Sequence, residues 1–500
     1  MIKFITSDKF LDQAANAYAV FVEQDFKFDQ LSEISKKFFP ALKDALKQRE
    51  FTGKAHSNLV LTSADDSKLI YLIFIGLGKV NKTMCDLESY RRALASVIRI
   101  AQSYKIEKLA IQLPDSKLFN AEVEEFSKET AVISLMSEYD FDDFKTDEEK
   151  KKKSDINLII CSDKKNIAQI KKGIEIGEFI GQCVNKARYW CDMPPAHKYP
   201  KILADYAKSL EKETDLKVTV FDSEQISKMG MGGIEGVCKG SEQKPRLVVM
   251  EHKAANKNAK KVVLVGKGVT FDSGGLSLKP ANAMETMKDD MAGAAVVTAA
   301  MRIISKLKLN INVIGITPLV ENMPSGSATR PGDILKFYNG KTAEVKNTDA
   351  EGRLILADAL SYAVKHYKPD AIIDFATLTG ACSYALGPFY CGLMTKHDDL
   401  AEKLKRASLT TGERVWSLPL DDDYKKAVRS EIADICNIGN ERYRAGAITA
   451  AFFLQNFVDD VPWVHLDIAG TAYGVPDIAY YRNGATAFGV RLIVDALICW

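Results

Sequence analysis

Short apolar runs alternate with stretches of helical periodicity through the second half of the chain, and this alternation constrains the fold most strongly. The apolar runs have the length of single strands, whereas apolar residues in the other stretches recur every three to four residues. The strand-like runs are residues 261–265, 311–319, 371–377 and 463–468, and the helical ones are residues 283–307, 354–366 and 485–497. This alternation predicts a largely parallel sheet with helices on both faces, and ligands of such sheets bind beyond the carboxyl ends of the strands.

The first half of the chain mixes strand and helix patterns in the same way. Apolar runs at residues 69–75, 109–113 and 156–161 accompany a helical pattern at residues 90–104. Apolar residues between 167 and 184 then recur at near-helical spacing, which predicts a long amphipathic connector helix. We therefore predict an α/β fold of two domains, each a mainly parallel mixed sheet flanked by helices and joined by this helix. The predicted boundaries are 1–162 for the first domain, 163–195 for the connector helix and linker, and 196–500 for the second domain.

Composition places the chain among ordinary globular proteins. Lys and Arg number 68 against 66 for Asp and Glu, so the net charge of +2 does not suit a protein that coats nucleic acid. Nine cysteines without a C-x-x-C pair favour reduced thiols, and we therefore expect the protein in the cytoplasm. The first residues lack the apolar segment of a signal peptide, and no apolar stretch reaches the ~20 residues of a membrane span. We expect no membrane anchor.

Acidic residues that follow strand-like runs are the strongest chemical signal. The sequence has no H-E-x-x-H, G-x-S-x-G or P-loop motif. A glycine-rich turn after residues 262–265 instead holds Lys267 and Asp272, and glycine lets the backbone approach a ligand closely. After Lys279 comes Asp290, inside a helical pattern whose other face is apolar. A carboxylate there is costly unless it is exposed, paired or bound to a metal.

A second acidic cluster, N-T-D-A-E-G-R at residues 347–353, precedes the helical run that begins at Leu354. Alternate side chains of an extended segment project to one side, so Asp349, Glu351 and Arg353 would converge. Arg353 also lies at a helix start, where free N–H groups and the helix dipole favour an anion. A small oxyanion held by Arg353 could act as a base.

Each acidic cluster alone has an ordinary structural explanation, because acidic residues near helix starts are usually caps and Asp-Gly or Glu-Gly steps are usually turns. The two clusters together indicate a metal site. Hard oxygen ligands without histidine suit two divalent cations that share bridging carboxylates. Four carboxylates would also balance the charge of two such cations, and they are Asp272, Asp290, Asp349 and Glu351.

The motif at residues 347–354, N-T-D-A-E-G-R-L, is highly specific, and with it the chain resembles the leucyl aminopeptidase (cytosol aminopeptidase) family of dimetal exopeptidases. Further segments match this family in the same order, at residues 266–275, 321–326, 376–381 and 465–472. The resemblance runs from about residue 165 to the C-terminus and is weak before it.

The resemblance implies roles for individual residues. The ligands of the tighter metal ion would be Lys267, Asp272, Asp290 and Glu351. The ligands of the more exchangeable ion would be Asp272, Asp349 and Glu351, so that Asp272 and Glu351 bridge. The two catalytic residues would be Lys279 and Arg353, with a bicarbonate ion held by Arg353. The substrate pocket would be lined by Met287 and Thr377, with a carbonyl contact from Leu378. Asp289, an extra acid beside Asp290, departs from the family pattern and leaves the assignment between the two neighbours open.

The resemblance also implies an activity and an assembly. The protein would release N-terminal residues, with leucine and other hydrophobic residues favoured, from peptides that have a free N-terminus. The attacking group would be a hydroxide that bridges two metal ions, with zinc or manganese as the expected metals and magnesium or cobalt as alternatives. The chain would form a homohexamer, a dimer of trimers, in which residues 1–162 are non-catalytic and related to assembly while residues 196–500 are catalytic.

Three other functions stay open on the sequence alone. A dimetal phosphoesterase would use similarly bridged carboxylates. DNA binding, a secondary role of some bacterial members of the family, is not supported by a net charge of +2. An inactive binding scaffold is the least favoured, because every ligand and both catalytic side chains of the family pattern are present.

Overall fold

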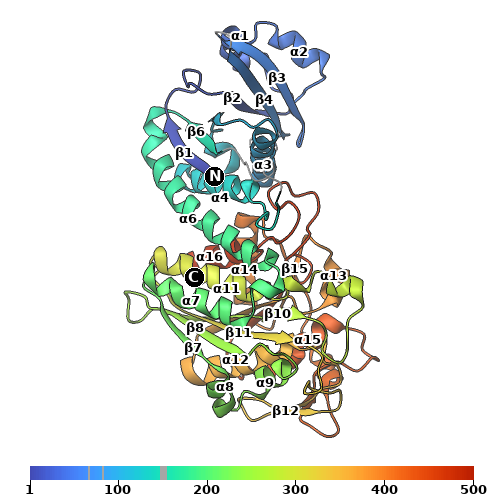
Figure 1. The fold of residues 1–500 in the computed structure, drawn as a ribbon. Helices are drawn as coiled ribbons and strands as arrows, with labels where there is room; N and C mark the ends of the chain where they lie inside the picture. The colour runs from blue at the N-terminus through green and yellow to red at the C-terminus, as the bar shows by residue number, and fades with distance from the viewer. Residues whose placement is uncertain (66–67, 81–83, 147–154) are drawn as a thin grey trace. The chain divides into compact units, whose positions relative to one another are not determined.

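The computed structural model describes residues 1–65, 68–80, 84–146 and 155–500, and these form two compact units of mixed α/β structure (Figure 1). The first unit comprises residues 1–185 and 477–482, and the second comprises residues 186–476 and 483–500. The predicted fold class, two domains with mainly parallel sheets flanked by helices and a long connecting helix, is confirmed. The exact domain boundaries taken from the sequence, at residues 162 and 195, stay a prediction.

The first unit is built on a six-stranded sheet in the order β1-β6-β5-β2-β4-β3. Its strands are β1 (Ile2–Ser7), β2 (Ala17–Glu23), β3 (Asn58–Asp65), β4 (Lys68–Gly78), β5 (Lys108–Gln112) and β6 (Ile156–Cys161). Neighbouring strands are parallel except for β3, which is antiparallel to β4. The helices of this unit are α1 (Ser32–Phe38), α2 (Leu42–Gln48), α3 (Leu87–Ser103) and α4 (Val123–Glu138). The three apolar runs predicted as strands in this half form β4, β5 and β6.

The connector helix α6 (Ile167–Asp192) has 26 residues, and its first part packs closely against α4. Glycines make this approach possible, because a Cβ atom at Gly173 would lie 2.2 Å from the carbonyl oxygen of Glu124. A Cβ atom at Gly177 would lie at the same distance from the carbonyl oxygen of Lys128. Because no other residue type leaves room for these contacts, the two glycines fix the line along which α6 crosses α4.

The second unit contains a nine-stranded sheet in the order β16-β15-β18-β14-β9-β11-β8-β7, with β10 paired to β11. Its strands are β7 (Lys217–Phe221), β8 (Arg246–His252), β9 (Lys261–Gly266), β10 (Gly268–Asp272), β11 (Asn312–Asn322), β14 (Ala371–Ala376), β15 (Cys391–Thr395), β16 (Val415–Ser417) and β18 (Trp463–Asp467). The pairs β7/β8, β8/β11 and β15/β18 are antiparallel and the other pairs are parallel. A small separate sheet joins β12 (Ile334–Lys336), β13 (Thr342–Glu344) and β17 (Ile435–Cys436).

Helices cover both faces of the large sheet, which explains why the central strand β9 is an unbroken apolar run (Figure 1). One face is covered by α7 (Pro200–Ser209), α11 (Ala292–Lys306), α14 (Asp398–Thr411) and α16 (Val490–Ile498). The other face is covered by α9 (Gly232–Cys238), α12 (Gly352–Tyr367) and α15 (Gly446–Gln455). Two short helices, α8 (Ser223–Met229) and α13 (Gly380–Leu386), complete the unit, together with a short turn of helix, α10 (Ala281–Met284). None of the helices in the described ranges combines the length and hydropathy needed to cross a bilayer.

The helix predicted at residues 283–307 is wrong in its first part. Residues 287–289 form a 3-10 turn, and α11 begins only at Ala292. The reason is a tertiary contact: the carbonyl of Asp290 accepts a hydrogen bond from the amide of Val269 in β10. Asp290 therefore lies in a turn at the edge of the sheet, ahead of the helix and not within it.

Candidate metal centre

The predicted ligands meet beyond the carboxyl ends of β9 and β10, where ligands bind in open parallel sheets. Lys267 lies between β9 and β10, and Asp272 is the last residue of β10. Asp290 lies in the turn before α11, and Glu351 immediately precedes α12. Segments that are far apart in the sequence therefore supply side chains to one place.

Three carboxylates form the centre of the site. Asp272, Asp290 and Glu351 each offer one oxygen, and these oxygens lie within 4.8 Å of one another. All three side chains are buried, with exposed fractions of 2%, 4% and 2%. The amine Nζ of Lys267 lies 2.7 Å from Asp290 Oδ1 and 2.9 Å from Glu351 Oε1. Four of the five predicted metal ligands therefore lie together in one buried group.

The fifth predicted ligand, Asp349, reaches the group through Lys279. Nζ of Lys279 lies 2.9 Å from Asp272 Oδ2 and also pairs with Asp349 Oδ1. The Lys279 side chain is 14% exposed and that of Asp349 is 32% exposed, so this edge of the site is open to solvent. The site thus has a closed end at Asp290 and an accessible end at Asp349.

The donor set fits divalent cations. Among the described residues, neither Asp290 Oδ2 nor Glu351 Oε2 has a hydrogen-bond donor, although both atoms are buried. Buried carboxylate oxygens without a donor are costly, and a cation bound between them would remove that cost. Carboxylate oxygens and one amine nitrogen are suitable ligands for two metal ions of the zinc or manganese type.

Burial and mutual repulsion perturb the carboxylates. Burial, reinforced by the negative charge of Glu351, raises the pKa of Asp272 to about 7. Burial also raises the pKa of Asp290 well above its ordinary value. Burial opposes ionisation of Glu351 too, but the ammonium groups of Lys267 and Lys279 outweigh it and lower the pKa of Glu351. Without cations, the two lysines supply part of the positive charge that four carboxylates require.

Arg353 is placed differently from the sequence-based prediction. The extended arrangement predicted for Asp349, Glu351 and Arg353 is wrong at its second half, because the carbonyl of Glu351 already accepts helical hydrogen bonds from Leu354 and Ile355. Arg353 therefore lies in the first turn of α12, where Nη1 donates to the carbonyl of Asn437 at 2.7 Å. Burial lowers the pKa of this guanidinium to about 10. Its Nε atom has no acceptor among the described residues, which leaves a buried donor for an anion.

Of the three predicted pocket residues, Thr377 directly contacts the closed end of the site. Met287 lies in the 3-10 turn before Asp290 and is half-buried. Thr377 follows β14, and its hydroxyl donates to Asp290 Oδ1 at 2.8 Å while its carbonyl accepts from Lys267 at 2.9 Å. The amide of Leu378 donates to Asp467 Oδ1 at 3.2 Å.

Three residues that shape the site were missed by the sequence analysis. Asn322 donates to Asp272 Oδ1 at 2.8 Å and so orients that carboxylate. Asp467 accepts from the hydroxyl of Thr379 at 2.7 Å and holds the loop after β14. Asn437 donates to the carbonyl of Asn347 at 2.6 Å and holds the loop of Asp349. Asn322 and Asp467 could have been predicted as site residues, because each lies at the end of a strand. Nothing in the local sequence indicates that Asn437 belongs to the site.

Comparisons with known proteins agree with this geometry. The model of the cytosol aminopeptidase family, catalytic domain, matches residues 185–494, and the model of the N-terminal domain of the same family matches residues 19–148. This chain belongs to the cytosol aminopeptidase family. A probable cytosol aminopeptidase of Roseiflexus castenholzii is 42% identical over 463 residues, which cover 92% of this chain and 93% of that protein. A probable cytosol aminopeptidase of Aquifex aeolicus is 40% identical over 483 residues, which cover 96% of this chain and 94% of that protein.

Two solved structures are similar to this chain over nearly all of its length. A mutant of tomato leucine aminopeptidase has a TM-score of 0.88 at 30% identity and covers all of this chain, with 97% of its own length covered. The bottromycin maturation enzyme BotP in complex with Mn has a TM-score of 0.85 at 30% identity, and the match covers 97% of this chain and 99% of BotP. Membership of the cytosol aminopeptidase family makes this chain a metal-dependent aminopeptidase, a hydrolase that acts on peptides.

Proposed function

We propose that the aminopeptidase works through two divalent cations held by Lys267, Asp272, Asp290, Asp349 and Glu351. The observation that carries this proposal is the buried group of carboxylates in which Asp290 Oδ2 and Glu351 Oε2 have no donor among the described residues. Lys267, Asp272, Asp290 and Glu351 would hold the tighter ion, in agreement with the burial of all four. Asp272, Asp349 and Glu351 would hold the more exchangeable ion, in agreement with the exposure of Asp349.

The side chains around the cations divide the remaining work. When bound, two divalent cations polarise the peptide carbonyl and activate water for attack at neutral pH. Lys279 would donate to the oxygen on which negative charge develops, because its amine lies between Asp272 and Asp349 at the accessible end. Arg353 would hold a bicarbonate ion, and this ion would supply a base for proton transfer from the attacking water to the leaving amine. The free Nε of Arg353 supports this anion site.

Restriction to the N-terminal residue follows from the depth of the site. The substrate's free α-amine is a potential ligand at the closed end, whereas a residue inside a peptide offers only an amide there. Met287, Thr377 and Leu378 would line the adjoining pocket and favour leucine and other hydrophobic first residues. Zinc or manganese are the proposed ions, with magnesium or cobalt as alternatives, and the manganese complex of BotP supports manganese. We further propose a cytoplasmic homohexamer arranged as a dimer of trimers, and the net charge of +2 gives no support to DNA binding.

The proposed roles are tested by metal content and turnover in two variants and one control variant. We expect Asp290→Asn to lose the tighter ion, because Asn cannot supply the anionic oxygen that a buried cation needs. We expect Lys279→Ala to keep both ions but to lose roughly 100- to 1000-fold in kcat, as oxyanion donors do. The measurements are metal analysis of the dialysed protein and hydrolysis of leucine p-nitroanilide.

Asp289→Asn is the matched control, because Asp289 is the neighbour of Asp290 and is also buried. It should keep both ions and its turnover. Phosphate monoesters serve as the second substrate class and should not be hydrolysed. Full metal content and full activity in Asp290→Asn, or loss of an ion only in Asp289→Asn, would remove Asp290 from the proposed ligand set.

A further inference from the structure

Lys198 is a lysine with no exposed surface in the second unit, close to the metal centre but outside the predicted ligand set. It follows the 3-10 turn at Pro195–His197. Its amine Nζ donates to the carbonyls of Trp190 at 2.7 Å and Cys191 at 3.0 Å, and also to the carbonyl of Lys288. An ammonium group has three hydrogens, so all of its donors are used by backbone carbonyls.

The three carbonyls belong to two segments that lie far apart in the sequence. Trp190 and Cys191 are in the last turn of α6, where carbonyls have no helical partner and the helix dipole favours a cation. Lys288 is in the 3-10 turn that leads to Asp290. The buried ammonium of Lys198 therefore joins the end of α6 to the backbone two residues before a proposed metal ligand.

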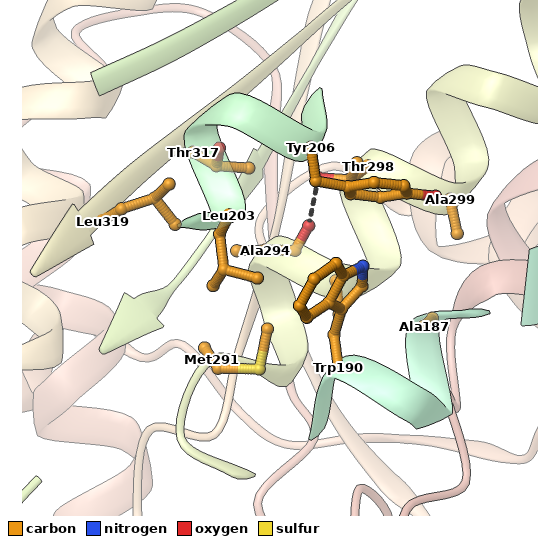
Figure 2. A pocket seen from close by; sticks show the side chains of 11 residues that line it. Ala187, Trp190, Leu203, Tyr206, Met291, Ala294, Thr298, Ala299, Thr317 and Leu319 are labelled. Atoms are coloured by element: carbon orange, nitrogen blue, oxygen red, sulfur yellow. Dashed lines mark hydrogen bonds between the residues drawn. The ribbon is translucent and has the colours of Figure 1, made fainter. Parts of the chain in front are cut away.

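A further hydrogen bond and one pocket link the same segments. The amine of Lys288 donates back to the carbonyl of Asp192, the last residue of α6, at 3.0 Å. On the other side of Asp290, the side chains of Met291 and Trp190 line one small apolar pocket with Leu203, and Figure 2 shows them around it. The end of α6 thus holds the chain before Asp290 by hydrogen bonds and shares a pocket with the residue after it.

We propose that Lys198 is a positioning residue of the metal centre, which fixes the turn at residues 287–291 against the end of α6 and thereby holds Asp290 in place for the buried cation. This inference rests on the proposed function, because it takes Asp290 as a metal ligand. Residues that do not bind the metal themselves but orient its ligands matter strongly, because their mutation typically lowers metal affinity or activity 10- to 100-fold. A free turn would let the Asp290 carboxylate move away from Lys267 and Glu351.

The test replaces Lys198 by Met, which keeps the unbranched chain up to the ε position but removes the amine and its three donors, and by Arg, which keeps the charge and several donors. Metal-free protein is titrated with Mn²⁺ by calorimetry, and kcat and KM are measured at saturating Mn²⁺. We expect Lys198→Met to weaken the tighter Mn²⁺ site 10- to 100-fold and to lower kcat more than it raises KM. Lys198→Arg should fall between this variant and the wild type.

Lys261→Met is the matched control. Lys261 also donates from its amine to the carbonyl at the end of a helix, that of Tyr367 in α12, at 2.8 Å, but it has no link to residues 287–291. Its loss should lower the melting temperature and leave Mn²⁺ affinity and kcat unchanged.

Each outcome decides the role of Lys198. The positioning role is overturned if Lys198→Met binds Mn²⁺ within twofold of the wild-type affinity and has an unchanged kcat. If Lys198→Met does not fold, the same result in Lys198→Arg overturns it, and a loss of at least threefold in affinity there supports it. Normal Mn²⁺ affinity in Asp290→Asn would instead refute the proposed function, so failure of the two proposals can be told apart.

Discussion

At the scale of single residues, the metal centre is a balance of buried charges. Lys267 and Asp290 are both buried, and Nζ of Lys267 lies 2.7 Å from Oδ1 of Asp290. Each side chain therefore stabilises the charged form of the other. The carboxylates around Lys267 outweigh its burial and raise its pKa. An amine that ligates a metal must be neutral, however, so uptake of a cation has to displace a proton from Lys267.

Proton release on metal binding is therefore the prediction at this scale. Asp272 has a pKa of about 7 in the metal-free protein, above the ordinary 3.8, because burial favours its neutral form. Below pH 7 a cation must displace this proton as well, so metal affinity should fall as the pH falls from about 7 to about 5. Calorimetry of Mn²⁺ binding in buffers of different ionisation enthalpy measures the protons released. Binding without proton release between pH 6 and pH 8 would contradict the prediction.

Residue types at the site were predictable from the sequence, but their supports were not. Asp272, Asp349 and Glu351 follow apolar runs or precede a helical one, and turns at such places mark the edge of a parallel sheet. Asn437 donates to the carbonyl of Asn347 and Lys198 to the carbonyl of Lys288, and each partner is about ninety residues away in the sequence. Such contacts exist only after the chain has folded, so no local sequence pattern predicts them.

At the scale of elements, helix α12 contains one residue of the candidate site and one residue that fixes the helix against its neighbours. Its first turn holds Arg353, and one turn further the buried carboxylate of Asp358 accepts from the amide of Ile234 at 2.9 Å and from the amide of Tyr338 at 2.8 Å. Ile234 is in α9, which packs on α12 so closely that a Cβ atom at Gly233 would lie 2.2 Å from the carbonyl oxygen of Leu354. Asp358 therefore fixes α12 against its neighbours.

Asp358→Asn should destabilise this packing without changing the chemistry. The amide group of Asn can accept at only one of the two positions and faces a second N–H with its own donor, so we expect a loss of about 1–3 kcal/mol. Thermal melting measures the loss, and kcat at saturating metal should stay within twofold of the wild type. Asp370→Asn is the control: Asp370 accepts from the amide of Lys261 at 2.8 Å, but its side chain is 40% exposed, so water can replace the bond. Equal melting temperatures for both variants would contradict the anchor role of Asp358.

Element positions were predicted well where apolar periodicity decides them and poorly where a tertiary contact does. The strand predicted at residues 156–161 is β6, and the strand predicted at residues 463–468 is β18 to within one residue. The start of α11 was displaced by nine residues, because the carbonyl of Asp290 bonds to β10. Hydrophobic spacing is a local quantity and cannot report a hydrogen bond to a strand some twenty residues away.

At the scale of the whole molecule, the chain enters the first unit twice. After residues 1–185 it forms the second unit, but residues 477–482 belong again to the first. Within the first unit, Tyr480 is 1% exposed and its hydroxyl donates to Glu88 Oε1 at 3.0 Å. Arg482 pairs with Asp140 at 2.7 Å. A short return segment is thus held by side chains of the N-terminal part of the chain.

A fragment that begins at residue 186 should therefore be less stable than the intact chain, although it contains every proposed metal ligand. It leaves the buried ring of Tyr480 without its surroundings and the carbonyl of Ala479 without Arg99, which donates to it at 3.2 Å. We expect the fragment to melt at least several degrees below the intact protein and to aggregate, because burial of one aromatic side chain contributes about 1.5–3 kcal/mol. Co-expression with residues 1–185 as a separate chain should restore the melting temperature, since it returns the missing partners. A fragment that melts with the intact protein would mean that residues 477–482 draw no stability from the first unit.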